Sequence, residues 1–212
     1  MVKWIFFDVG STLVDETEAY DHRVREMIAG TSITFKEFDD VRIALAQQGL
    51  DGNSSAIKHF GLTKTPWHSE DEIPYSDAQS TLAALIDKGY KLGIIANQKN
   101  GTTERLVFWG LRQYFDVIAA SAELGYAKPD KEIFEKAFEL AKCTAAESIM
   151  VGDRLDNDII PAKAIGMKTV WVSSLRIKKQ GEVKNFCRSH PAGPRRIGLA
   201  QSSGKSTLPT KE

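Results

Sequence analysis

Apolar, strand-forming runs alternate with helix-forming segments along most of this 212-residue chain. The helix-forming segments carry an apolar residue every three or four positions, and glycines stand at several boundaries. This alternation predicts an α/β fold with a doubly wound parallel sheet, because parallel strands need a crossover connection. The expected strands are residues 2–9, 91–96, 116–120, 148–151 and 168–172, and the expected helices between the later strands are residues 78–88, 102–111, 131–142 and 158–165.

Acidic residues stand at the ends of two of these strands. If the sheet reverses direction once, the strands counted along the chain lie in the order 3-2-1-4-5, and strands 1 and 4 flank the switch point. Strand 1 ends at Asp8 and strand 4 ends at Asp153. Asp8 alone is either a capping acid of the turn or a site residue. Its expected meeting with Asp153, where such folds bind ligands, favours the site.

The segment between the first two strands is helical and polar. Its apolar spacing predicts helices at residues 16–30, 36–49 and 54–61, followed by a loop over residues 63–75. We therefore expect an α/β core made of residues 1–14 and 76–175 and a small helical insert of residues 15–75. The tail, residues 176–212, has no apolar period and is expected to be poorly ordered.

Charge and composition exclude several classes of function. Residues 1–175 contain 26 acidic and 19 basic side chains, which argues against a nucleic-acid binder, whereas residues 176–212 contain 2 and 9. The two cysteines, Cys143 and Cys187, provide neither a disulfide framework nor a metal-binding spacing. No signal segment and no apolar run of ~18 residues is found, so a cytoplasmic protein without membrane association is expected. Nothing in the sequence indicates the oligomeric state.

Chemically active side chains collect at one expected edge of the sheet. They are residues 8–12, Asn97, Lys128, Asp153 and Asp158. Carboxylates beside one lysine suit Mg²⁺ together with an anionic phosphoryl group, and a carboxylate can be the nucleophile. The alternative is structural: Lys128 pairs with an acid, and Asp153 and Asp158 cap the following helix.

Four segments resemble the four motifs of the haloacid dehalogenase-like hydrolase superfamily. They are residues 7–15 (FDVGSTLVD), 93–97 (GIIAN), 128–130 (KPD) and 151–158 (VGDRLDND). The resemblance covers residues 2–172, with the motifs in the family's order. It implies subfamily I, with a Rossmann-like core and residues 15–75 as a helical type-1 cap.

The resemblance also implies a role for each motif residue. Asp8 would be the nucleophile that forms an aspartyl-phosphate, and Lys128 would hold both the nucleophile and the phosphate. The implied phosphate-binding residues are Ser11, Thr12, Asn97 and Lys128. The implied Mg²⁺ ligands are Asp8, Gly10 through its backbone carbonyl, Asp153 and Asp158. The expected function is a phosphatase acting on a small phosphorylated substrate.

Two positions depart from the family pattern. Phosphatases of this family carry a second aspartate, the general acid/base, two residues after the nucleophile, where this chain has Gly10. General acid–base help is typically worth ~10²–10⁴-fold in rate. A phosphatase without it would favour good leaving groups, such as acyl or aryl phosphates, or take an acid from Asp15, Glu16 or the substrate. The hydroxyl residue usual before the asparagine of the second motif is Ala96 here.

These departures leave alternative functions open. One is a catalytically weakened domain that binds a phosphorylated ligand or a protein partner. Another is a phosphonate-type hydrolase, which would need a Schiff-base lysine in the cap, with Lys36, Lys58 and Lys64 as candidates. Family dehalogenases also lack the second aspartate, but they use no metal, and the retained Asp153 and Asp158 argue against them.

The insert offers several side chains that could face a substrate. For each of them a solvated helix face is the simpler interpretation, and His59 and His68 show no metal-ligand spacing. The candidates are His22, Arg23, Arg25, Arg42, Lys58, His59, Trp67 and His68.

Overall fold

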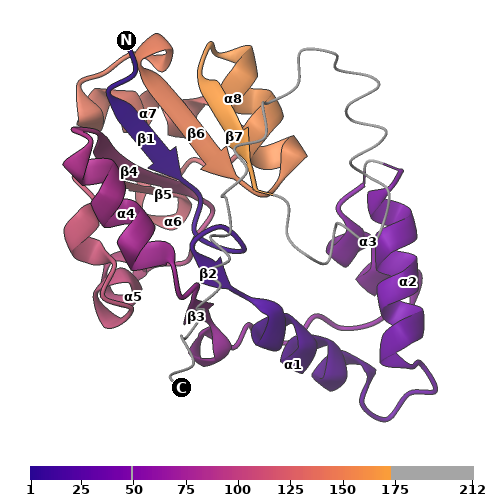
Figure 1. Ribbon diagram of the computed structural model, residues 1–212. Coiled ribbons are helices and arrows are strands. Elements are labelled where there is room, and N and C mark those ends of the chain that lie inside the picture. The colour runs from indigo at the N-terminus through magenta and orange to yellow at the C-terminus, as the bar shows by residue number, and fades with distance from the viewer. Residues whose placement is uncertain (49, 173–212) are drawn as a thin grey trace, which may run out of the picture.

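Five parallel strands form the central sheet in the computed structural model, which describes residues 1–48 and 50–172 (Figure 1). The strands lie in the order β5-β4-β1-β6-β7, and every neighbouring pair is parallel. Counted along the chain, this is the predicted order 3-2-1-4-5. The doubly wound α/β fold is therefore confirmed. The strands are β1 (Trp4–Phe7), β4 (Lys91–Ala96), β5 (Val117–Ala120), β6 (Ser148–Gly152) and β7 (Lys168–Trp171).

Helices cover both faces of the sheet because side chains of each strand point alternately to the two faces. Along β1, Ile5 and Phe7 join one buried cluster and Phe6 joins the other. The first cluster is covered by α4 (Ala78–Asp87) and α5 (Thr102–Phe108), and the second by α7 (Lys131–Ala141) and α8 (Ile160–Ala164) (Figure 1).

Among the helices of the core, three places differ from the prediction by more than one residue. The helix predicted for residues 102–111 ends at Phe108, because Gly110 adopts a left-handed φ of 66° that breaks the helical path. The helix predicted for residues 158–165 begins as a π-helical turn, Leu155–Ile159, before α8. A short helix, α6 (Ser121–Leu124), follows β5 in a segment for which no helix is predicted.

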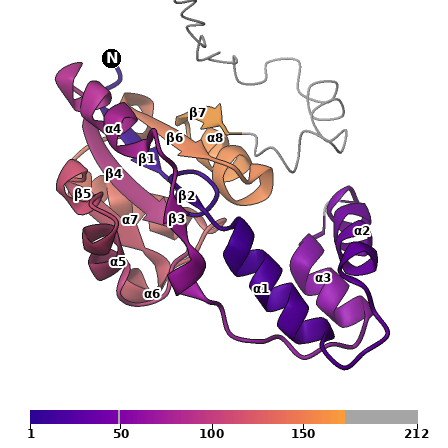
Figure 2. The ribbon, with the colours of Figure 1, turned by 60° about the horizontal axis from the view of Figure 1, so that its bottom comes forward.

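The insert contains the three predicted helices and has a hydrophobic cluster of its own. They are α1 (Thr17–Ile28), α2 (Phe35–Ala46) and α3 (Gly52–His59). This cluster contains one fully buried side chain from each helix: Val24, Phe38 and Ala56. Thr34 and Glu37 form a capping box that fixes the start of α2. Figure 2 shows the three helices as a separate group beyond the end of the sheet.

A two-residue antiparallel pair joins the insert to the core, and the sequence did not predict it. Strand β2 (Val14–Asp15) leads into the insert, β3 (Ile73–Pro74) leads out of it, and the two pair with each other. A second contact is an ion pair between Arg154 of the core and Asp51 at the start of α3, with Nη2 and Oδ2 3.6 Å apart. The predicted tail, residues 176–212, lies outside the described residues. Within the described ranges, every helix is too short or too polar to cross a bilayer.

Candidate active site

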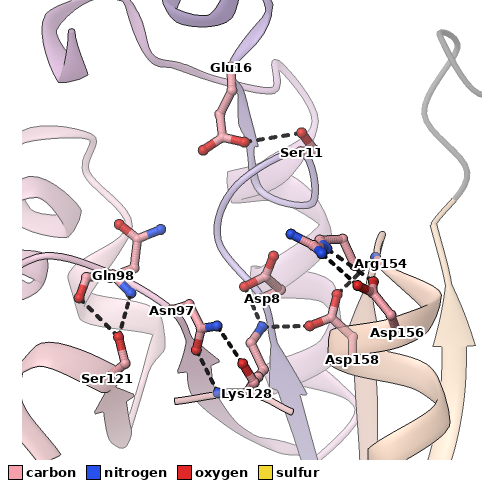
Figure 3. A network of polar contacts seen from close by, with 10 residues as sticks. All are labelled: Asp8, Ser11, Glu16, Asn97, Gln98, Ser121, Lys128, Arg154, Asp156 and Asp158. Carbon is pink, nitrogen blue, oxygen red and sulfur yellow. Dashed lines mark hydrogen bonds and ion pairs between the residues drawn. The ribbon is translucent and has the colours of Figure 1, made fainter. Parts of the chain in front are cut away.

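Lys128 connects two aspartates that come from distant parts of the chain. Its Nζ lies 2.7 Å from Oδ1 of Asp8, which follows β1, and 2.5 Å from Oδ1 of Asp158, in the turn after β6 (Figure 3). The Lys128 side chain is 2% exposed and that of Asp158 is 1% exposed. A buried ammonium needs compensating charge. The contacts therefore explain why β1 and β6 must be neighbours for this site to form.

Asn97 fixes the backbone of Lys128. Its Nδ2 donates to the Lys128 carbonyl oxygen at 2.8 Å, and its Oδ1 accepts from the Lys128 backbone N–H at 2.7 Å (Figure 3). Because Asn97 directly follows β4, this pair of hydrogen bonds ties the lysine to the end of that strand. Both polar atoms of the amide are engaged with Lys128, so the side chain positions the lysine.

The segment after β6 supplies two further carboxylates, those of Asp153 and Asp158. The backbone carbonyl of Val151 accepts a hydrogen bond from the N–H of Asp8 at 2.9 Å, which holds the ends of β1 and β6 together. Asp158 Oδ2 accepts from the Arg154 backbone N–H at 2.9 Å, so both of its oxygens are occupied. A Cβ on Gly152 would overlap the Asp158 carboxyl, which is why this strand end needs a glycine.

The loop after Asp8 brings Glu16 back over the site. Ser11 adopts a left-handed φ of 53° and its Oγ donates to Oε2 of Glu16 at 3.2 Å (Figure 3). A Cβ on Gly10 would overlap the carboxylate of Glu16. The Thr12 hydroxyl is buried and makes no hydrogen bond within the described residues. The space next to Gly10 therefore already contains a carboxyl group, supplied by the first turn of the insert.

Burial and mutual repulsion shift the protonation of these groups. Burial, followed by the charges of Asp8 and Asp158, raises the pKa of Asp153 to about 8. Burial, followed by the charge of Asp8, raises the pKa of Glu16 to about 7. Burial alone would lower the pKa of Lys128, but the two aspartates raise it above its ordinary value. The site thus holds an excess of negative charge that one ammonium does not neutralise.

The three aspartates are close enough to share one ion. One carboxylate oxygen each from Asp8, Asp153 and Asp158 lies within 4.8 Å of the others. Oxygen donors of this kind are the ligands that Mg²⁺ prefers. Within the described residues, no hydrogen bond uses the Asp153 carboxylate, whereas Asp158 is saturated by Lys128 and Arg154. The residues present therefore fit a magnesium ion, with Asp153 as its freest ligand.

The structure brings most of the predicted site residues to one edge of the sheet. Asp8, Asn97, Lys128, Asp153 and Asp158 meet there, and Ser11 and Thr12 lie in the loop that follows β1. Sequence reasoning named Glu16 only as one of several possible acids. What singles out Glu16 is that its carboxyl folds back against Gly10 across the short loop after β1.

Known proteins resemble this chain over most of its length. The protein-family model described as haloacid dehalogenase-like hydrolase matches residues 5–172. Glyceraldehyde 3-phosphate phosphatase of Methanothermobacter thermautotrophicus is 32% identical over 204 residues, covering 82% of this chain and 87% of that protein. Pyrimidine 5'-nucleotidase of Escherichia coli is 30% identical over 198 residues, covering 81% and 86%. A crystal structure of a HAD phosphatase from Thermococcus onnurineus is 26% identical, with a TM-score of 0.55, and covers 82% of this chain and 86% of that one.

Proposed function

The chain belongs to the haloacid dehalogenase-like hydrolase family, and on that premise we propose that it is a Mg²⁺-dependent phosphatase of small phosphorylated metabolites. One observation carries the proposal: the buried ammonium of Lys128 holds the carboxylate of Asp8 beside two further aspartates. This arrangement supplies a nucleophile, a cation for phosphoryl oxygens and a metal site together.

The named activities of two relatives support a phosphorylated substrate. One is called a glyceraldehyde 3-phosphate phosphatase and the other a pyrimidine 5'-nucleotidase. Both names describe removal of phosphate from a small molecule. Because their identities to this chain are similar, neither name selects the substrate within that class.

The reaction we propose begins at Asp8. Its Oδ1 is bonded to Lys128, which leaves Oδ2 to attack the substrate phosphorus. The new bond joins Oδ2 to phosphorus as the bond from phosphorus to the leaving oxygen breaks, giving an aspartyl-phosphate and an alkoxide that needs a proton. Water then cleaves the acyl phosphate, which regenerates the Asp8 carboxylate and releases inorganic phosphate.

Lys128 and the acidic cluster have different tasks in this proposal. The Lys128 ammonium binds and orients the Asp8 carboxylate, and Asn97 holds the lysine by its backbone. Asp8 and Asp153 would hold Mg²⁺ together with the Gly10 carbonyl, while Asp158 supports the site by binding Lys128. When bound, the ion neutralises charge on the phosphoryl oxygens. The Thr12 hydroxyl makes no hydrogen bond within the described residues and is the candidate donor to those oxygens, whereas the Ser11 hydroxyl already donates to Glu16.

We assign the missing acid to Glu16. Its carboxyl lies against Gly10, next to the position at which the family's second aspartate begins. Its raised pKa, about 7, lets a proton reside there at neutral pH, and Ser11 fixes its direction. In this role Glu16 protonates the leaving oxygen and then takes a proton from the attacking water.

The insert, residues 15–75, is proposed to act as the cap over this site. Glu16 links the two parts directly, because it stands at the start of α1 while its carboxyl reaches the core. The paired strands β2 and β3 hold both connections of the insert at the same edge of the sheet. A cap placed there controls solvent access and substrate choice.

The deciding experiment measures phosphate release from aryl, acyl and alkyl phosphates, including glyceraldehyde 3-phosphate and pyrimidine 5'-nucleotides. Each substrate is assayed with Mg²⁺, with chelator and with the Asp8→Asn variant. Metal-dependent release that disappears in Asp8→Asn is the expected result. Release equal to that of the variant on every substrate would overturn the proposal and favour a domain that only binds a phosphorylated ligand.

A further inference from the structure

Gln98 lies beside the proposed site, and neither the motifs nor the relatives give it a role. It follows Asn97 in the turn after β4 and is half-buried. Figure 3 shows its side chain at the same edge of the sheet as Asp8 and extending toward the side on which Glu16 lies. A polar side chain in this position can contact a substrate that reacts with Asp8.

The backbone of Gln98 is fixed by hydrogen bonds to the end of the neighbouring strand, β5. Ser121 Oγ accepts from the Gln98 N–H at 3.0 Å and donates to the Gln98 carbonyl at 3.2 Å (Figure 3). The Ala122 N–H donates to the same carbonyl at 3.2 Å. Both backbone polar groups of Gln98 are therefore occupied, and only its side-chain amide remains to bind a ligand.

Arg105 fixes the orientation of that amide. Its Nη2 donates to Gln98 Oε1 at 2.6 Å, and its Nη1 donates to the Asn100 carbonyl at 3.4 Å. Because a guanidinium has donors only, it selects the oxygen of the amide and leaves the nitrogen on the opposite edge. Among the described residues, no hydrogen bond uses Gln98 Nε2. The chain thus holds an unused donor in a defined direction.

The unused donor faces the space between Asp8 and the insert. In Figure 3 the amide nitrogen of Gln98 is on the side nearer to Asp8 and Glu16, and the amide oxygen is on the far side. The electrostatics agree with this direction: burial raises the pKa of Glu72, and the charge of Arg105 opposes that rise. Since Glu72 directly precedes β3, the pair of Arg105 and Gln98 lies close to the insert.

The proposed reaction determines which part of a substrate would meet this donor. The attacking and leaving oxygens of a phosphoryl transfer lie roughly in line, so the leaving group extends away from Asp8. Glu16, the proposed acid for the leaving oxygen, lies on the same side as the amide nitrogen of Gln98. Lys128 and the Thr12 hydroxyl are already available to the phosphoryl oxygens. Gln98 Nε2 therefore faces the leaving group.

We propose that Gln98 determines specificity by donating its Nε2–H to an oxygen of the leaving group, an inference that rests on the proposed phosphatase function. This donor suits phosphate esters of polyols and sugars, in which the carbon next to the ester carbon carries a hydroxyl or carbonyl oxygen. A simple alkyl group offers no acceptor. One neutral hydrogen bond of this kind is typically worth about 3–10-fold in kcat/KM.

The test compares two esters with the same number of carbon atoms, glycerol 3-phosphate and propyl phosphate, using the full-length protein with Mg²⁺. The measured quantity is the ratio of their kcat/KM values, in which a general loss of active protein cancels. Gln98→Met keeps the length without the donor, so this ratio should fall about 3–10-fold while propyl phosphate is hydrolysed as by the wild type. Gln98→Glu keeps an oxygen for Arg105 but replaces the donor by an acceptor, so it should lower the ratio as well.

The matched control is Gln113→Met, because Gln113 is exposed and its Nε2 donates to the Gly110 carbonyl instead. It should leave the ratio unchanged. An unchanged ratio in both Gln98 variants, or an equal loss on both esters in Gln98→Met, would overturn the assignment while leaving the phosphatase function intact. Wild-type release from neither ester would also overturn it, and assays with aryl and acyl phosphates then show whether the proposed function fails as well.

Discussion

The carboxylate of Glu16 occupies the space in which a Cβ on Gly10 would lie. The glycine and the glutamate are therefore two halves of one arrangement: the absence of a side chain at position 10 makes room for the carboxyl at position 16. Ser11, between them, donates its hydroxyl to that carboxyl. In the proposed function, this relationship replaces the second aspartate of the family with an acid from the cap side of the site.

Replacing Glu16 with glutamine tests this assignment through the leaving group. Glu16→Gln keeps the shape but has no proton to transfer, so hydrolysis of alkyl phosphates should slow by about 10²–10⁴-fold. Aryl phosphates, whose leaving groups need little protonation, should be much less affected. Measuring kcat and KM across a series of leaving groups checks this, with Glu18→Gln, whose side chain is 64% exposed, as control. An equal loss on all substrates would assign Glu16 a structural role.

Restoring the family aspartate at position 10 should require a second change. Gly10→Asp alone would force the Glu16 carboxylate out of its place, so we expect slower alkyl-phosphate hydrolysis than in the wild type. Combining it with Glu16→Ala frees the space and should raise the rate above that of either single variant. A double-mutant cycle on kcat/KM measures this coupling. Additive effects of the two changes would show that the carboxyls do not compete for one position.

Removing the ammonium of Lys128 should affect both activity and stability. Lys128→Met leaves Asp8 and Asp158 close together without their cation, which typically costs about 3–5 kcal/mol of unfolding free energy. Adding Asp158→Asn removes one of the stranded charges and should recover part of the stability but none of the activity. Urea unfolding in chelator, beside the phosphatase assay, measures both. Lys131→Met, whose lysine is 62% exposed, should change neither.

Much of this fold follows from local patterns. The strands are short apolar runs, their crossovers are amphipathic helices, and one reversal of the winding places Asp8 and Asp153 together. That reasoning needs only periodicity and the known chirality of parallel sheets. It therefore predicts where strand ends converge, and with them Lys128 and Asn97.

Features that depend on the placement of single side chains could not be predicted from the sequence patterns. Glu16 reaches Gly10 only because a tight loop and the two-residue strand β2 reverse the chain, and a two-residue strand has no periodicity to detect. His68 meets α1 from an irregular segment, so the stacking of its ring on His22 has no spacing signal in the sequence.

Glu72 should make the stability of the protein fall as the pH rises. It is 8% exposed, Trp67 donates to one of its oxygens at 2.6 Å, and the other oxygen is buried without a hydrogen bond among the described residues. Burial raises its pKa above the ordinary value of 4.5, against the opposing hydrogen bond from Trp67. The folded state thus retains a proton that the unfolded chain releases, and this contribution is lost between pH 4.5 and the raised folded pKa.

Glu72→Gln removes that titration while keeping an acceptor for Trp67. A neutral amide with one unpaired group costs less to bury than a carboxylate, so the variant should be more stable than the wild type at pH 8. At pH 4.5 and below, where the wild-type carboxyl is protonated, the difference should shrink toward zero. Thermal unfolding of both proteins at the two pH values measures this, with Glu18→Gln controlling for loss of an exposed charge. A difference that stays constant with pH would mean that Glu72 is already neutral, or already solvated, in the folded protein.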